Sequence, residues 1–179
     1  MPNRNLKVLA IDPSSTNTGW CVWDGRDAVI WSSGYGDIEY HSERLATFEE
    51  DVSTAIAQHR PTTVAFEIPP VTSNHTVVML LMGMAGMVQL AAERAGLSVL
   101  PVNLRTIKAH GGANKFTQFL KSKQTSSQKT ANRKASKEAM IQAATYMGFT
   151  VENDDEADAA ILADYVLRSA VVGEAGRAA

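Results

Sequence analysis

The N-terminal third of the chain carries short apolar runs separated by polar turns, which is the pattern of β-strands. Three such runs follow one another, with a polar turn after Asp12 and a second turn, DGRD, at residues 24–27. Two later runs, TTVAFEI and LSVLPV, complete a set of five. Strands are therefore expected at about residues 6–12, 19–24, 28–35, 62–68 and 97–102.

Elsewhere the apolar residues recur at intervals of three and four, or run together, which indicates helices. Helices are expected from Ser42 to before Pro61 and at about residues 74–95, 104–109, 137–147 and 155–171. Three strands, then a helix, a strand, a helix, a strand and further helices make an α/β order. The expected fold is one five-stranded mixed sheet, with a three-strand antiparallel meander plus two parallel strands, flanked by helices.

One long segment breaks the pattern. Residues 110–136 are rich in Ser, Thr, Gln and Lys and are expected to form a basic loop. Between Arg105 and Lys137 there are nine basic residues and no acidic one, although the whole chain has a net charge of −2. A polyanion such as DNA is expected to bind there. The chain is interpreted as a single domain over residues 1–172, with a frayed tail at 173–179.

Two features bear on the class and location of the protein. The apolar run from Val77 stops at Gln89, short of the roughly 20 residues that span a bilayer, so it is interpreted as a buried helix and no membrane is expected as a partner. Its glycines, Gly83 and Gly86, suit close packing within the core or across a dimer. A lone cysteine, Cys21, and the lack of an apolar signal segment at the N-terminus favour a cytoplasmic protein.

Several acidic residues lie at the ends of predicted strands or at the start of a predicted helix, where binding and catalytic sites form in α/β sheets. Asp12 and Glu67 each end a predicted strand, while Asp155 and Asp158 are three residues apart and share a helix face. Asp12 alone could be a turn residue and Asp155 a favourable charge at a helix N-terminus. Four converging carboxylates would repel one another and require cations, for which Mg²⁺ is suited. The other acids of this region, Asp154, Glu156 and Asp164, are expected to be solvated.

Several motifs occur in the order of a known family. IDPSSTNTGW, FEIPP, an Asn-His-Thr start to a helix with LMGMAG, and DEADAAILA together resemble the RuvC family of Holliday junction resolvases, which has an RNase H-like fold. The resemblance implies a metal-dependent endonuclease whose catalytic carboxylates, Asp12, Glu67, Asp155 and Asp158, bind two Mg²⁺ or Mn²⁺ ions. It also implies a homodimer that cuts a four-way DNA junction by paired symmetric nicks, leaving 5′-phosphate and 3′-hydroxyl ends, without an organic cofactor.

The family also has a lysine near the scissile phosphate, and two residues compete for that place. Lys137 is favoured over Lys115 because an apolar helix pattern follows it. The residues expected to bind DNA are Arg105, Lys108, Lys115, Lys121, Lys123, Lys129, Arg133, Lys134 and Lys137. One departure concerns the turn after Asp12, where Ser14 replaces the usual glycine of the family and is expected to alter the turn.

Other functions remain open at this point. An RNase H-like nuclease could act on other branched DNA or on RNA–DNA hybrids, because the metal chemistry is shared by the fold. Acid-ended strands also occur in ATP-binding modules of the actin and Hsp70 type, although those need two such domains. A non-catalytic DNA-binding module is the remaining alternative, and the presence of all four matched acids argues against it.

Overall fold

The computed structural model describes residues 6–70, 73–112 and 126–177 of the chain. The strands are β1 (Val8–Asp12), β2 (Asn17–Trp23), β3 (Ala28–Gly34), β4 (Thr63–Glu67) and β5 (Ser98–Val102). The helices are α1 (His41–His59), α2 (His75–Arg94), α3 (Leu104–Gly111), α4 (Ser126–Tyr146) and α5 (Asp154–Arg177).

The five strands form one mixed sheet in the order β3-β2-β1-β4-β5. β1, β2 and β3 pair antiparallel as consecutive neighbours, whereas β4 lies parallel to β1 and β5 lies parallel to β4. The expected meander with two added parallel strands is confirmed. The outcome follows from chain connectivity, because tight turns join antiparallel neighbours while helices α1 and α2 make the crossovers that parallel neighbours need.

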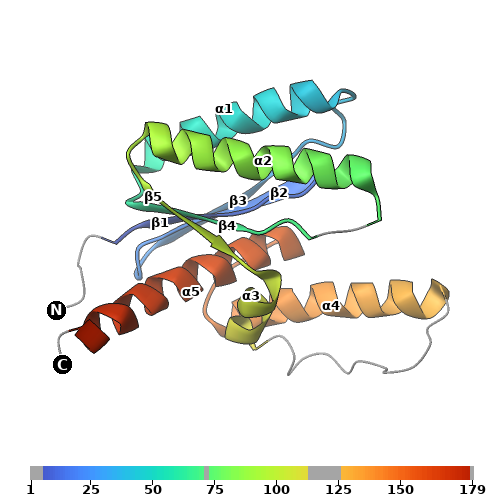
Figure 1. The fold of residues 1–179 in the computed structure, drawn as a ribbon. Coiled ribbons are helices and arrows are strands. Elements are labelled where there is room, and N and C mark those ends of the chain that lie inside the picture. The colour runs from blue at the N-terminus through green and yellow to red at the C-terminus, as the bar shows by residue number, and fades with distance from the viewer. Residues whose placement is uncertain (1–5, 71–72, 113–125, 178–179) are drawn as a thin grey trace.

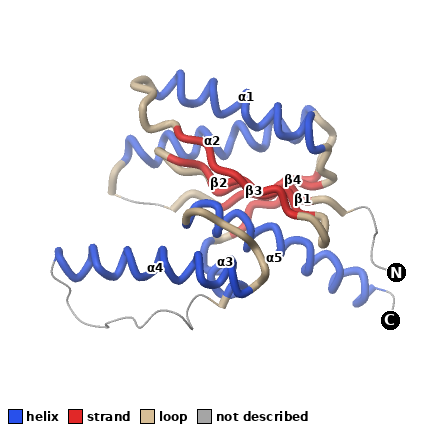
Figure 2. The backbone as a smooth tube through the Cα atoms, turned by 180° about the vertical axis from the view of Figure 1, so that it is seen from behind, coloured by secondary structure: helices blue, strands red, loops and turns tan. Residues whose placement is uncertain are grey.

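Helices cover both faces of the sheet, so the molecule has three layers (Figure 1). α1 and α2 cover one face, where Leu9, Ile11, Phe48, Met84 and Val88 belong to one buried cluster. α5 packs on the other face against β1, β2, β3 and β4, and α3 and α4 pack against α5, so most of the buried helix residues on this side come from α5. Figure 2 shows the same layers from behind, with the strands between the two groups of helices.

α2 is the one helix in the described part of the chain that is long and apolar enough to cross a membrane. It packs on the sheet and on α1, with Leu80, Leu81 and Met84 buried. A Cβ at Gly83 would meet the side chain of Leu45 at 3.0 Å, so this glycine permits the close approach of α1 and α2. The helix interpreted as buried is buried on this side, and its opposite side is exposed.

Two further expectations about the C-terminal half are wrong. The segment from Ser126 to residue 136, expected as loop, forms the first turns of α4, and α5 continues to Arg177 instead of ending near residue 171. The first stretch contains Ala, Lys, Gln and Arg, which favour a helix even without an apolar face. The second, VGEAGR, contains two glycines, and no local pattern in it predicts a helix. The start of α4 is exposed, and only residues from Ala139 onward are buried. Residues 113–125 lie outside the described residues.

Candidate active site

Two carboxylates meet at the carboxyl end of the central parallel strands. Asp12 is the last residue of β1 and Glu67 is the last residue of β4. The strands pair in parallel with Ile11 opposite Phe66, so the next residues along each strand lie side by side. The two carboxyl groups also interact electrostatically. The adjacency expected from the sequence is therefore present in the fold.

The first turn of α5 brings the other two carboxylates to the same point. Asp155 and Asp158 both interact electrostatically with Asp12, and Asp158 also interacts with Glu67. We call these four side chains the carboxylate cluster. Its members come from two strands and one helix that are far apart in the sequence.

A glycine on β2 allows α5 to come this close. Gly19 pairs with Asp12 across the antiparallel ladder and is buried. A Cβ on Gly19 would lie 1.9 Å from the backbone carbonyl oxygen of Asp155, a distance that no side chain can occupy. Sequence reasoning did not assign this residue a role. The signal was a glycine inside the otherwise bulky strand NTGWCVW, which indicates close backbone approach.

The N-terminus of α5 is held in place by polar side chains. The Asn153 side-chain oxygen accepts a hydrogen bond from the Glu156 backbone N–H at 2.9 Å, while the Glu156 carboxylate accepts one from the Glu152 N–H at 2.8 Å. This reciprocal arrangement resembles a capping box. Asn153 also donates to the Ser32 hydroxyl at 3.1 Å, which ties the helix start to β3. The expectation that Glu156 is solvated was wrong, because this capping role buries it.

Asn17, the first residue of β2, orients one carboxylate of the cluster. Its side-chain amide donates a hydrogen bond to Asp155 Oδ2 at 2.8 Å. The pKa of Asp155 is raised by burial, and this hydrogen bond opposes the rise by favouring the ionised form. Asn17 was missed by sequence reasoning because its partner lies 138 residues away.

The turn between Asp12 and Asn17 is fixed from both sides. The Ser14 N–H donates to the buried Thr18 hydroxyl at 3.3 Å. Arg44 of α1 donates to the backbone carbonyls of Ile38, Ser15 and Gly36 at 2.6, 3.1 and 3.2 Å. Ser14 does not adopt a positive φ, since Arg60 is the one non-glycine residue with positive φ in the described part of the chain. Serine therefore fits here without backbone strain.

The cluster is electrostatically strained in the absence of cations. Burial raises the pKa of Asp12 well above its usual value, and the charges of Glu67, Asp158, Asp155 and Asp154 raise it further. Burial likewise raises the pKa of Glu67 to about 7 and that of Asp158 to about 8. Lys108 of α3 opposes both shifts, because its positive charge favours the ionised carboxylates. Lys108 is half-buried, and its charge acts on two members of the cluster.

The donor set fits a hard divalent cation. All four side chains offer oxygen atoms, which Mg²⁺ and Mn²⁺ prefer. Asp158 Oδ1 is buried without a hydrogen-bond partner, as expected for an acceptor whose partner is an ion. In the described part of the chain no group of three or more His, Cys, Asp or Glu side chains is already arranged around one metal position. The side chains would therefore have to close on a bound ion.

Of the two candidates for the lysine near the scissile phosphate, Lys137 lies within the described residues and Lys115 does not. Lys137 of α4 forms an ion pair with Asp154 at 2.6 Å, next to the first turn of α5, and its charge also lowers the pKa of Asp155. Asp154, expected to be solvated, is thus paired and has a side chain only 20% exposed. Lys115 lies outside the described residues, as do Lys121 and Lys123.

The other described basic residues expected to bind DNA lie on helices α3 and α4. Arg105 and Lys108 lie on α3, and Arg133 and Lys134 lie on α4. Lys134 pairs with Glu138 on the solvent side of α4 at 3.8 Å. Lys129 lies on α4, and its side chain is outside the described part of the structure.

The free energy of unfolding of the metal-free protein is expected to fall as the pH rises from about 5 to about 8. Glu67 and Asp158 have raised pKa values of about 7 and about 8, so the folded chain keeps protons that the unfolded chain has lost. Because deprotonation then disfavours the folded state, stability decreases with pH across this window. Urea unfolding between pH 5 and pH 9 measures the slope. Added Mg²⁺ should restore stability at the alkaline end by binding the folded state.

The control for this experiment is Asp158→Asn, which removes one titrating group and one repulsive charge. The variant should show a shallower slope and a smaller response to Mg²⁺. A wild-type stability that is flat from pH 5 to pH 8, or that rises, would contradict the raised pKa values.

Comparison with known proteins is consistent with this geometry. The family model described as crossover junction endodeoxyribonuclease RuvC matches residues 8–121, which include Asp12 and Glu67 but end before α5. The RuvC of Azorhizobium caulinodans is 30% identical over 104 residues, covering 55% of this chain and 62% of that protein. The RuvC of Afipia carboxidovorans is 29% identical over 132 residues, covering 68% of this chain and 77% of that protein.

Solved structures share the fold over nearly the whole chain. Thermus thermophilus RuvC in complex with a Holliday junction substrate superposes with a TM-score of 0.66 at 19% identity, covering 96% of both chains. The yeast mitochondrial Holliday junction resolvase superposes with a TM-score of 0.55 at 14% identity, covering 94% of this chain and 81% of that one. These likenesses establish an RNase H-like fold that includes α5. With the family model matched from β1 to beyond α3, the chain belongs to the RuvC family of crossover junction endodeoxyribonucleases.

Proposed function

We propose that this protein is a structure-selective endodeoxyribonuclease that resolves four-way DNA junctions by paired symmetric nicks. The observation that carries the proposal is the convergence of Asp12, Glu67, Asp155 and Asp158 from β1, β4 and α5, with pKa values raised by burial. Such a cluster is costly to keep in a fold unless cations neutralise it. Family membership adds the substrate, because the named relatives are crossover junction nucleases.

The carboxylate cluster would hold two divalent ions, Mg²⁺ or Mn²⁺. When bound, the ions would supply an activated water for in-line attack and would stabilise the leaving 3′ oxygen, giving 5′-phosphate and 3′-hydroxyl ends. The residues of the chain orient and balance these charges: Asn17 holds Asp155 by a hydrogen bond, and the charge of Lys108 acts on Glu67 and Asp158. Lys108 and Lys137 would also attract the phosphate, and Arg105, Arg133 and Lys134 extend a basic surface over α3 and α4.

A homodimer suits a substrate that is itself nearly two-fold symmetric. The exposed side of α2 supports this assignment, since Met79, Met82 and Leu90 on it are 75%, 57% and 43% exposed. Gly86 lies between them with nothing within 4 Å of a built Cβ, so another backbone could approach there. We assign this face to the second copy. We also place the enzyme in the cytoplasm, with residues 1–172 as one nuclease domain.

The purified protein is expected to cut a synthetic four-way junction in Mg²⁺ or Mn²⁺ more than about 10³-fold faster than linear duplex of the same sequence. This factor is the lower end of the usual ratio between specific and non-specific DNA binding. Gel analysis of end-labelled strands gives the rates, and treatment with ligase tests the chemistry of the ends. Nicks at symmetry-related positions that ligase seals are the expected result.

The comparison substrates separate this proposal from its rivals. Preferred cleavage of a fork or flap would make the protein a nuclease for other branched DNA. Cleavage of an RNA–DNA hybrid at an equal rate would indicate an RNase H type of activity. Binding without cleavage of any substrate would leave a non-catalytic DNA-binding module, and ATP binding would favour the actin and Hsp70 type.

A further inference from the structure

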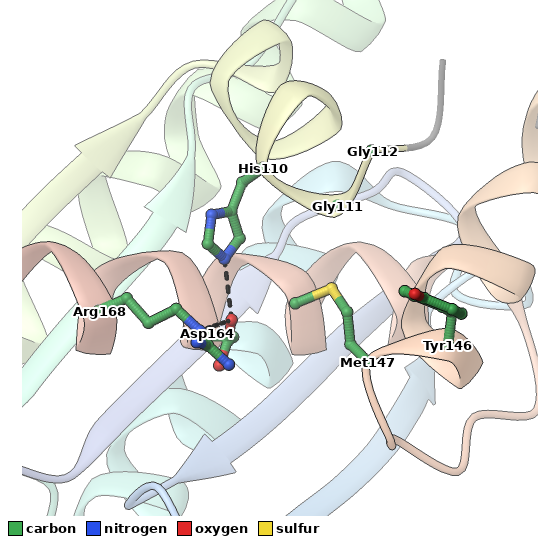
Figure 3. A pocket seen from close by; sticks show the side chains of 7 residues that line it. All are labelled: His110, Gly111, Gly112, Tyr146, Met147, Asp164 and Arg168. Atoms are coloured by element: carbon green, nitrogen blue, oxygen red, sulfur yellow. Dashed lines mark hydrogen bonds and ion pairs between the residues drawn. The ribbon is translucent and has the colours of Figure 1, made fainter. Parts of the chain in front are cut away.

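A buried carboxylate on α5 joins two basic residues from different elements. Asp164 has a side chain only 4% exposed, and its Oδ2 lies 2.9 Å from His110 Nε2 and 2.6 Å from Arg168 Nε (Figure 3). The expectation that Asp164 is solvated was wrong because the last turn of α3 covers it. The contact lies in the helical layer, well along α5 from the carboxylate cluster, and the proposed chemistry does not use it.

Of these two contacts, the one with His110 links two helices. Arg168 is four residues after Asp164 on the same helix, whereas His110 belongs to α3. A buried carboxylate that keeps both hydrogen bonds is costly to separate from them. The His110 ring also meets Tyr165 of α5 edge-on, with ring centroids 5.5 Å apart. The next residue, Gly111, lies so close to α5 that a Cβ would meet Ile161 at 2.9 Å. The last turn of α3 is therefore docked on α5 through consecutive residues.

The same short helix carries Lys108. α3 has eight residues and begins directly after β5, with the Asn103 side chain capping its first turn at the Arg105 N–H. Ile107 is its one buried residue, so the core itself holds little of α3. Lys108 stands two residues before His110 and acts electrostatically on Glu67 and Asp158. A change in how α3 rests on α5 would move this charge relative to the cluster.

We infer that the His110–Asp164 contact is a positioning device, which docks the last turn of α3 on α5 so that Lys108 stays directed at the carboxylate cluster. The inference rests on the proposed function, because it assigns Lys108 to the scissile phosphate. The contact borders a hollow of about 520 Å³ lined also by Gly112, Tyr146 and Met147. Shortening His110 would enlarge this hollow and remove the hydrogen-bonded contact between α3 and Asp164. His110 is thus a positioning residue, and Lys108 is the group through which it acts.

His110→Ala is expected to lower kcat for junction cleavage by about 10- to 100-fold, the usual effect of losing a residue that orients a catalytic group. The effect should fall on kcat more than on KM, because Lys108 is one of several basic residues on α3 and α4 that would attract the DNA. His110→Gln keeps an amide that can donate to Asp164 and should recover much of the rate. The matched control is His41→Ala, at the exposed start of α1, which should cleave at the wild-type rate.

The decisive measurement is a double-variant cycle with Lys108→Met, which removes the charge but keeps the length of the side chain. If His110 acts through Lys108, the double variant cleaves no more slowly than Lys108→Met alone. Multiplied losses in the double variant would overturn the inference, as would wild-type kcat in either single variant. His110→Leu, which keeps contact with Tyr165 but cannot bond to Asp164, replaces His110→Ala if the alanine variant does not fold.

A second readout separates this inference from the proposed function. Backbone amides of residues 104–111 should exchange hydrogen faster in His110→Ala than in the wild type, while those of β1 should not change. Unchanged exchange in α3 would overturn the docking role whatever the substrate. If the wild-type protein fails to cut a junction but α3 still loosens in the variant, the proposed function fails and the docking contact stands.

Discussion

Asp12→Asn is expected to abolish junction cleavage. The cleavage rate should fall by more than roughly 100-fold, which is the loss expected when a residue that only orients a metal ligand is removed. Asp12 stands at the centre of the carboxylate cluster, next to Glu67 along the sheet edge and within electrostatic reach of Asp155 and Asp158. Asparagine has the same shape but offers one neutral oxygen acceptor in place of a charge. Rates of junction cleavage at saturating Mg²⁺ measure the loss, and mobility-shift binding in Ca²⁺ should be unchanged.

A control at the other end of the sheet is Asp27→Asn, an exposed acid on the turn between β2 and β3. It should cleave at the wild-type rate. The Asp12 variant should also be more stable than the wild type at pH 8 without Mg²⁺, because one buried charge has been removed from the cluster. If Asp12→Asn cleaved the junction normally, Asp12 would not belong to the active site and would be only a turn residue.

Gly19→Ala is expected to have the second largest effect. The added methyl group would meet the carbonyl oxygen of Asp155 at 1.9 Å, and this obstacle is backbone that cannot rotate away. The first turn of α5 must therefore lift from β2, which carries Asp155 and Asp158 away from Asp12. A displacement of about 1 Å at a catalytic group costs on the order of 10²-fold in rate. We therefore expect the cleavage rate of Gly19→Ala to fall by this factor. We also expect its free energy of unfolding to fall by about 3 kcal/mol, at the upper end of the usual cost of overpacking.

The matched control is Gly34→Ala on the neighbouring strand β3. Nothing lies within 4 Å of a Cβ built on Gly34, and its φ is not positive. This variant should unfold at nearly the wild-type urea concentration and keep its activity. Equal stability and activity of Gly19→Ala and Gly34→Ala would show that α5 does not need the close approach at Gly19.

The acids of the two parallel strands could be predicted because strand patterns are local. Asp12 and Glu67 each follow a run of apolar residues, and any sheet that places these strands in parallel as neighbours must bring their carboxyl ends together. The pair on α5 was predictable in the same way, since residues three apart share a helix face. What these patterns could not supply was the distance between the sheet and α5, which depends on Gly19.

Charge patterns alone were less informative. The basic run was interpreted as a loop because Lys, Gln and Ser are polar, yet its second part, from Ser126, is the exposed start of α4. Asp164 and Glu156 were interpreted as solvated for the same reason. One is covered by α3 and the other caps α5. Whether a charged residue is buried depends on what packs over it, and that partner is distant in the sequence.

The sequence by itself determined the order of strands and helices and the mixed sheet, because these follow from neighbouring residues and their periodicity. It also predicted the four acids as one site, from their positions and from the resemblance to a known family. Only the tertiary structure decided that the charge of Lys108 acts on the carboxylate cluster, that Asn17 orients Asp155, and that His110 and Asp164 join α3 to α5. Each of these joins residues from separate elements. Their distances are set by how helices rest on the sheet, a property that no local pattern of residues contains.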